Sequence, residues 1–351
     1  MIFRQLFDNA SSTYTYLLAD GRSREAIVID SVFEQSARDL ALIRELDLKL
    51  LYAIDTHCHA DHVTGAWLMK QKTGCRIGAA KVIGAANVDV ELEHHDVISF
   101  GQHSLEVRAT PGHTNGCLTY VTEDQARAFT GDALLIRGCG RADFQQGNAG
   151  MLYDSISKQI LSLPDSCLIY PGHDYNGRTV SSIAEEKAFN ARIGGKANKQ
   201  DFLGYMDAMQ LPHPKHIDVA LPANMASGKP EDDNLLTEPD WAPMVLTFAG
   251  VMEVEPSWTA EHLAQIYLLD VREPQECLPG ETTMADTSIP LGQLRERLEE
   301  IPKNKPVMAI CRSGRRSAMA AGILRQAGFE KVASVAGGLL RWKDEGLPLV
   351  T

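Results

Sequence analysis

Residues 51–62, with the sequence LYAIDTHCHADH, determine how the N-terminal part of this chain can fold. The first five are mostly apolar and predict a β-strand. The rest include four side chains that can bind a metal, His57, His59, Asp61 and His62. In an apolar core these groups would repel one another or be poorly solvated. On a loop that follows a strand they can instead surround a cation. The segment therefore predicts a metal site at the end of a strand.

Three more metal-binding side chains occur further along the chain, each where an apolar run ends. They are His113 in TPGHTNG, Asp132 in FTGDALL and His173 in YPGHDY. A glycine precedes each of them and permits a tight turn with close backbone approach. Any one of them alone could be a surface or core residue. Together with the H-x-H-x-D-H cluster they favour a metal centre.

The pattern of apolar residues predicts two domains. Strands are expected at 26–30 and 51–55, with a helix over 36–48 between them, and further short strands and turns follow. A stretch rich in Pro, Gly and acidic residues predicts a linker at 229–250 between domains at 1–228 and 251–351. In the second domain strand and helix patterns alternate, with one helix expected over LGQLRERLEEI. This rhythm predicts a small α/β domain with a parallel sheet.

Composition excludes several classes of function. The chain has 351 residues and a net charge of −12, without a block of Lys or Arg, which argues against nucleic-acid binding. No apolar run is long enough to span a membrane, and the N-terminus lacks the features of a signal or transit peptide. Seven scattered cysteines with no C-x-x-C spacing suit reduced thiols. We therefore expect a cytoplasmic protein, either a monomer or a homo-oligomer.

A second reactive motif is the sequence CRSGRRS at 311–317, which lies between a predicted strand and a predicted helix. A loop of this length can turn its backbone N–H groups toward the sulfur of Cys311. Together with the helix N-terminus and the arginines, these groups would stabilise a thiolate and a bound anion. The alternative is a buried cysteine that merely ends a strand, and the three arginines and glycine around it argue against that.

The first motif set resembles the metallo-β-lactamase superfamily, whose fold is an αββα sandwich. Within it, the segments FTGDALLIRGCGRADFQQG and YPGHDYNGR resemble the persulfide dioxygenases, with glyoxalase II as close kin. The resemblance implies one Fe(II) per chain, held by His57, His113 and Asp132. It also implies that glutathione persulfide and O₂ are converted to sulfite and glutathione.

The resemblance leaves the number of metal ions open. His59, Asp61, His62 and His173 would complete a two-metal hydrolase site as in glyoxalase II. In a dioxygenase we expect them to orient the ligands and shape the pocket. The family pattern further implies that glutathione contacts three side chains, Arg141, Tyr175 and Arg178, although a solvated surface role is the alternative for each arginine.

Residues 255–351 resemble a rhodanese domain. The match rests on LLDVREP at 268–274, the CRSGRRS loop, and GGLLRWKDEGLPL at 337–349. It implies that Cys311 is a nucleophile that carries sulfur as a persulfide between thiosulfate and glutathione or glutathione persulfide. The other residues implied are the donor-binding loop and a supporting pair, namely Arg312, Ser313, Gly314, Arg315, Arg316, Asp270 and Arg272. The stretch PGETTMADTSIP at 279–290 departs from the usual pattern and leaves substrate preference open.

The sequence as a whole predicts a bifunctional sulfur-metabolism enzyme. The alternatives are a dizinc glutathione thioesterase fused to a rhodanese, or a C-terminal module that senses persulfide without catalysis. The direction of sulfur flux is not encoded in any motif.

Overall fold

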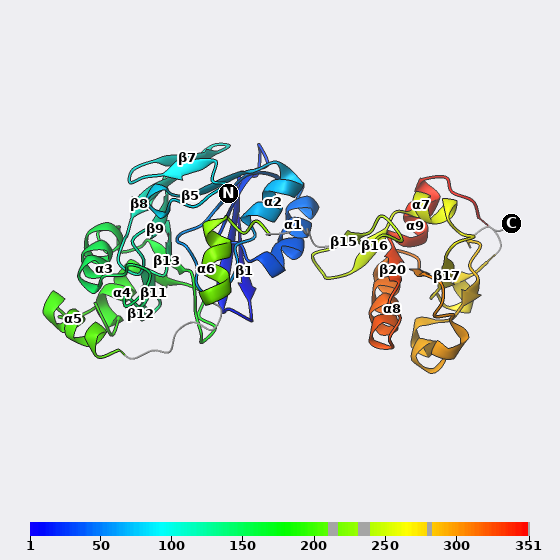
Figure 1. Ribbon diagram of the computed structural model, residues 1–351. Coiled ribbons are helices and arrows are strands. Elements are labelled where there is room, and N and C mark those ends of the chain that lie inside the picture. Colours follow the sequence, from blue (N-terminus) through cyan, green and yellow to red (C-terminus); the bar gives the residue numbers. More distant parts are fainter. Residues whose placement is uncertain (210–216, 231–238, 279–282, 350–351) are drawn as a thin grey trace. The chain divides into compact units, whose positions relative to one another are not determined.

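The computed structural model describes residues 1–209, 217–230, 239–278 and 283–349. The chain forms two compact units, one of Met1–Ser36 with Leu46–Leu235 and the other of Ala37–Glu45 with Leu236–Thr351. Figure 1 shows the elements of both. None of the helices described is long and apolar enough to cross a membrane.

Two six-stranded sheets form the centre of the first unit. In the first sheet the strands follow chain order; β1 to β3 pair antiparallel, and β3 to β6 pair parallel. Its strands are β1 (Ile2–Asp8), β2 (Thr13–Ala19), β3 (Glu25–Ile29), β4 (Lys49–Ile54), β5 (Arg76–Ala80) and β6 (Val90–Leu92). The second sheet has the order β14-β13-β10-β9-β8-β7, and its only parallel pair is β10 with β13. Its strands are β7 (Val97–Phe100), β8 (His103–Ala109), β9 (Leu118–Thr122), β10 (Arg127–Gly131), β13 (Leu168–Pro171) and β14 (Ser181–Ser182).

Apolar residues of the two sheets pack face to face. Tyr16, Phe100, Tyr120 and Phe129 are buried in this layer, because alternate side chains of each strand point toward the facing sheet. Helix α2 (Ala66–Thr73) packs on β4 and β5. A second cluster joins the other sheet to its helices, which are α3 (Ala149–Ser155), α4 (Ile183–Phe189) and α5 (Lys199–Asp207). The predicted αββα sandwich is therefore present.

The second unit contains a six-stranded sheet of order β15-β16-β20-β19-β17-β18. Four of its five pairings are parallel, and β15 joins antiparallel. Apolar clusters cover both faces of the sheet, one including α8 (Arg315–Gln326) and the other including α9 (Gly338–Asp344). The remaining elements are β16 (Met252–Val254), α7 (Pro256–Glu261), β17 (Tyr267–Asp270), β18 (Thr287–Ser288), β19 (Val307–Ile310) and β20 (Val332–Val335).

One sequence prediction about local structure needs correction. The segment 291–301 forms two short 3₁₀ helices, Leu291–Glu296 and Leu298–Glu300, and no α-helix. Its apolar residues, Leu291, Leu294, Leu298 and Ile301, are spaced by three, four and three positions, and the two steps of three coincide with the two 3₁₀ helices. The strand β15 (Val245–Leu246) lies inside the stretch predicted as a linker and pairs with β16. Residues 231–238 of that stretch lie outside the described residues.

The other predicted elements occur close to their expected positions. The strands at 26–30 and 51–55 correspond to β3 and β4, and the helix predicted over 36–48 is α1 (Ser36–Glu45). Helix α6 (Ile217–Met225) is the last described helix of the first unit. The unusual PGETTMADTSIP stretch begins at 279–282, which lie outside the described residues.

Candidate functional site

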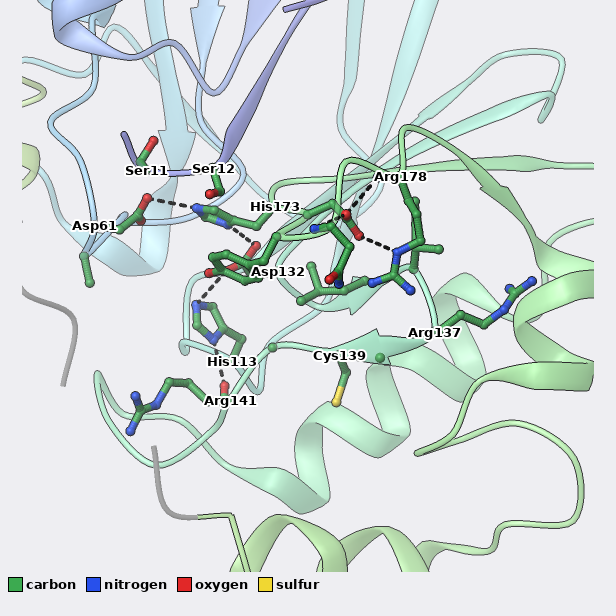
Figure 2. Close-up of a pocket in the computed structure, with 18 of the residues that line it drawn as sticks. Ser11, Ser12, Asp61, His113, Asp132, Arg137, Cys139, Arg141, His173 and Arg178 are labelled. Atoms are coloured by element: carbon green, nitrogen blue, oxygen red, sulfur yellow. Dashed lines mark hydrogen bonds and ion pairs between the residues drawn. The ribbon is translucent and has the colours of Figure 1, made fainter. Parts of the chain in front are cut away.

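The predicted metal-binding residues of the first unit come together at one edge of the sandwich. His57 follows β4 of the first sheet, whereas Asp132 follows β10 and His173 follows β13 of the second sheet. His113 lies in the turn after β8. Figure 2 shows a chain of contacts that runs from Asp61 through His173 and Asp132 to His113. Strand ends of both sheets therefore contribute to a single site.

Three of these residues form a compact group of metal ligands. His57, His113 and Asp132 each offer one ligand atom, and these atoms lie within 4.8 Å of one another. His113 Nε2 is 3.7 Å from Asp132 Oδ2, which is too long for a hydrogen bond. Two ligands about 2.1 Å from one shared ion can have such a separation. The positions of the three ligand atoms thus fit one metal ion.

Hydrogen bonds hold the imidazoles of His57 and His113 each in one orientation. His113 Nδ1 donates to the carbonyl oxygen of Arg141 at 2.7 Å, which leaves Nε2 as the ligand atom. His57 Nδ1 is 3.0 Å from Thr56 Oγ1, and the Thr56 hydroxyl donates to Asp30 Oδ2 at 2.8 Å. Because the Thr56 proton goes to Asp30, Thr56 can accept the Nδ1 proton of His57. Such contacts fix the tautomer of a metal-binding histidine.

The charge states of these ligands also suit a divalent cation. Burial and the neighbouring His59 lower the pKa of His57 well below its usual value, so its imidazole is neutral. Burial alone would raise the pKa of Asp132, but the charge and hydrogen bond of His173 hold it below its usual range. Two imidazoles and a carboxylate are a ligand set that binds divalent metals such as zinc and iron.

The remaining residues of the motif make contacts of a different kind. His173 Nδ1 is 2.7 Å from Asp132 Oδ1, and its Nε2 is 2.9 Å from Asp61 Oδ2. Burial opposes protonation of His173, yet the two carboxylates raise its pKa well above the usual value. His62 Nδ1 lies 3.0 Å from the same Asp61 oxygen. In this arrangement both nitrogens of His173 are engaged by carboxylates.

His59 is not one of the three grouped ligands, although its ring centroid lies 4.1 Å from that of His57. Its Nε2 is 3.2 Å from Asp30 Oδ1, and although burial lowers its pKa, the charge of Asp30 raises it to about 9. Two buried ring nitrogens have no hydrogen-bond partner in the described part of the chain, namely Nδ1 of His59 and Nε2 of His62. With Asp61 they form a second group that could hold a cation.

A cavity of about 750 Å³ opens beside the ligands. The three predicted glutathione contacts, Arg141, Tyr175 and Arg178, all line it. Tyr175 is 72% exposed and its ring stacks on His173 with 5.9 Å between centroids. Each arginine already has an acidic neighbour: Arg141 pairs with Asp143 at 2.6 Å, and Arg178 pairs with Asp174 at 3.0 Å.

Several residues of this site escaped the sequence prediction. Arg137 and Arg192 also line the cavity, as Figure 2 shows for Arg137; Arg137 lies in the segment FTGDALLIRGCGRADFQQG but was not singled out, and Arg192 belongs to no recognised motif. Asp30 and Thr56 support His57, and Thr13 Oγ1 is 3.0 Å from His173 Nε2. The position of Asp30 at the end of a strand, like the other site residues, is the one signal that could have identified it.

The second unit places Cys311 directly after β19 and before α8. Gly314 caps that helix in a left-handed conformation, with φ of 86°, so the N-terminus of α8 begins next to the cysteine. Burial would raise the pKa of Cys311. The Ser317 hydroxyl, 3.5 Å from the sulfur, and the backbone N–H groups of Ser317, Ser313 and Arg316 lower it below the usual value.

The charged residues around Cys311 have different roles. Arg316 is held by both oxygens of Glu276, at 2.6 and 2.7 Å. Arg272 forms a buried ion pair with Asp270 at 2.7 Å. These two residues of the DVR sequence therefore support the structure. Arg312 is exposed on the loop, and Arg315 is exposed at the first position of α8. The sequence prediction missed two residues near Cys311, namely Glu276 and the buried Ser334. The hydroxyl of Ser334 is 2.9 Å from that of Ser317.

The fold and these two sites define a metallo-β-lactamase-type domain with grouped metal-ligating residues, followed by a small α/β domain with a cysteine next to a helix N-terminus. The model of the metallo-beta-lactamase superfamily matches residues 8–173, and the model of the rhodanese-like domain matches residues 255–345. A mouse (Mus musculus) protein named "Persulfide dioxygenase ETHE1, mitochondrial" is 52% identical over 229 residues, which is 65% of this chain and 89% of that protein.

Solved structures and more distant relatives agree with this match. The crystal structure of ETHE1 from Myxococcus xanthus is 51% identical, with a TM-score of 0.63, and covers 65% of this chain and 100% of that one. A hydroxyacylglutathione hydrolase of Rhodopseudomonas palustris is 32% identical over 191 residues, which is 54% of this chain and 73% of that protein. The chain belongs to the persulfide dioxygenase family of the metallo-β-lactamase superfamily, and it carries a C-terminal rhodanese domain.

Proposed function

We propose that the first unit is an Fe(II)-dependent dioxygenase that converts glutathione persulfide and O₂ to glutathione and sulfite. The observation that carries this proposal is the convergence of His57, His113 and Asp132 beside an arginine-lined cavity. The similarity to proteins named persulfide dioxygenase supports the choice of substrate.

The reaction balances without an additional reductant. Glutathione persulfide, O₂ and water give glutathione, sulfite and protons as the bond between the two sulfurs breaks. The outer sulfur loses four electrons, and one O₂ accepts four. When bound, Fe(II) would supply the open coordination positions and the redox chemistry that bring the persulfide sulfur and O₂ together.

The side chains of this unit would bind and orient the substrate. The imidazoles of His57 and His113 and the carboxylate of Asp132 would hold the metal. Glutathione is anionic, and the cavity offers guanidinium groups for its carboxylates. The predicted ones belong to Arg141 and Arg178, with the exposed ring of Tyr175 beside them, whereas the Arg137 guanidinium is bound to Glu185 and Glu186.

We further propose that the second unit transfers sulfur through Cys311. Its thiolate attacks the outer sulfur of thiosulfate; a new bond between two sulfurs forms, and sulfite leaves with the electron pair of the broken bond. The thiolate of glutathione then attacks the outer sulfur of the Cys311 persulfide, which releases the Cys311 thiolate and forms glutathione persulfide. The exposed Arg312 and Arg315 would attract the anionic donor.

A second candidate for the first unit is a dizinc hydrolase of glutathione thioesters. The buried, unpartnered nitrogens of His59 and His62 beside Asp61 favour it, because they could hold a second cation. The similarity to a protein named hydroxyacylglutathione hydrolase is in line with it. The two carboxylate contacts of His173 favour the single-metal alternative, because they already use both of its nitrogens.

Metal analysis combined with an oxygen electrode separates these candidates. We expect about one iron per chain, and O₂ uptake with glutathione persulfide that is lost in His113→Ala. The matched control is Cys311→Ser, which should keep O₂ uptake and lose sulfur transfer from thiosulfate to glutathione. Two zinc ions per chain, with thioester cleavage in place of O₂ uptake, would contradict the dioxygenase proposal.

A further inference from the structure

A buried asparagine on the last helix of the first unit contacts the metal-binding loop. Asn224 is on α6, more than 160 residues after the loop in sequence, and is 6% exposed. Its Nδ2 donates to the carbonyl oxygens of His59 at 2.9 Å and His62 at 2.8 Å. Its Oδ1 accepts the backbone N–H of Thr64 at 2.8 Å. One side chain thus bonds three backbone groups across six residues.

These hydrogen bonds stabilise a loop that has no regular secondary structure. Residues 57–62 belong to no helix or strand, so their backbone groups have no ladder partners within the loop. Buried backbone carbonyls need a hydrogen-bond donor, and the carboxamide of Asn224 supplies both of its N–H groups to two of them. A carboxamide is also the shortest side chain that offers two donors and an acceptor.

The backbone after Asn224 is packed tightly against the same loop. Gly228 has φ of 76°, and a Cβ at this position would lie 2.1 Å from the carbonyl oxygen of Thr64. Ser227 fixes this end of the helix at a different place, because its hydroxyl donates to the carbonyl oxygen of Ala86 at 2.6 Å. Among the described contacts of this helix end, those of Asn224 reach residues 57–62, whereas Ser227 bonds Ala86 and Gly228 packs against Thr64.

We propose that Asn224 is a positioning residue that fixes the loop 57–62 so that His57 is placed for metal binding. The inference rests on the metal centre proposed above. Asn224 touches neither the metal position nor the substrate cavity, so its action passes through the backbone of the loop. Residues that orient metal ligands typically change metal affinity by about 10- to 100-fold when replaced. We expect about 10-fold here, because the contact is indirect.

The test uses the full-length protein loaded with Fe(II) under anaerobic conditions. Iron affinity is measured by competition with a chromogenic chelator, and the ligand field by electron paramagnetic resonance of the nitric oxide adduct. Asn224→Ala removes all three hydrogen bonds. Asn224→Asp keeps the shape and the acceptor for Thr64 and removes both donors. Ser227→Ala is the matched control, since it removes a buried hydrogen bond of the same helix end.

Both Asn224 variants should bind iron about 10-fold more weakly and give a broadened spectrum. Ser227→Ala should keep the affinity and spectrum of the wild type, even if its metal-free form unfolds at a lower temperature. Wild-type affinity and spectrum in Asn224→Asp would overturn the assignment, and so would an equal loss of affinity in Ser227→Ala. If the wild-type protein itself binds no iron, the metal centre fails, and the role of Asn224 fails with it.

Discussion

Replacing Ser317 by alanine should raise the pKa of Cys311 and move its reactivity to higher pH. The Ser317 hydroxyl lies 3.5 Å from the sulfur and makes the largest of the contributions that lower this pKa; backbone N–H groups contribute as well. Ser334 is 2.9 Å from Ser317 and can donate to its oxygen, so the Ser317 proton is shared between the thiolate and the carbonyl oxygen of Gly314, 3.0 Å away. Alanine leaves the thiolate with backbone donors alone.

The size of the effect follows from one hydrogen bond to a charged group. Such a bond contributes about 1.5–3 kcal/mol, and the lower value applies because three backbone donors remain. One pKa unit corresponds to about 1.4 kcal/mol, so the pKa of Cys311 should rise by about 1 unit. The sign follows from the charge: a lost donor destabilises the thiolate, so deprotonation requires higher pH.

The assay is alkylation by iodoacetamide over a range of pH, with each cysteine followed by peptide mass spectrometry. The pH midpoint for Cys311 should be below that of a free thiol in the wild type and about 1 unit higher in Ser317→Ala. Cys58 and Cys117 serve as internal controls, since burial raises the pKa of each to about 12. An unchanged midpoint in Ser317→Ala would refute the idea that this hydroxyl stabilises the thiolate.

Two further substitutions test the support of each site. Thr56→Val removes the hydroxyl between His57 and Asp30 and should weaken iron binding about 10-fold, whereas Thr56→Ser keeps the hydroxyl and should bind as the wild type does. Equal affinities of the two variants in a chelator competition would speak against this role. Glu276→Gln leaves the charge of Arg316 uncompensated and should raise kcat/KM for dianionic thiosulfate about 3- to 5-fold, the equivalent of about 0.7–1 kcal/mol. Because the pKa of Glu276 is about 2, this gain should be the same from pH 6 to pH 9, and a gain confined to high pH would contradict it.

The two proposed activities share the chemistry of sulfane sulfur. The second unit would form glutathione persulfide from thiosulfate, and the first would consume it. Sulfite is a product of both reactions, and glutathione released by oxidation is the acceptor in transfer. A chain that carries both sites can therefore recycle glutathione while oxidising the outer sulfur of thiosulfate.

Many features of the fold and of the candidate site could be predicted from the local sequence. Strand β4, which precedes His57, and the turns that carry Asp132 and His173 were predicted because apolar runs and glycines mark them in the sequence. The parallel sheet of the second unit followed in the same way from alternating strand and helix patterns. These features depend on residues close together in the chain, and local propensity and periodicity report them directly.

The tertiary structure decided which of these residues act together. The sequence contained seven residues able to bind a metal, but only the folded chain groups His57, His113 and Asp132 and turns His173 toward two carboxylates. Likewise, no motif pairs Arg316 with Glu276, or Asn224 with the loop near His59. Such contacts join residues 40 to 165 positions apart. They arise from strand register and helix packing, because a hydrogen bond needs its two atoms placed within a few tenths of an ångström, and no local pattern specifies that.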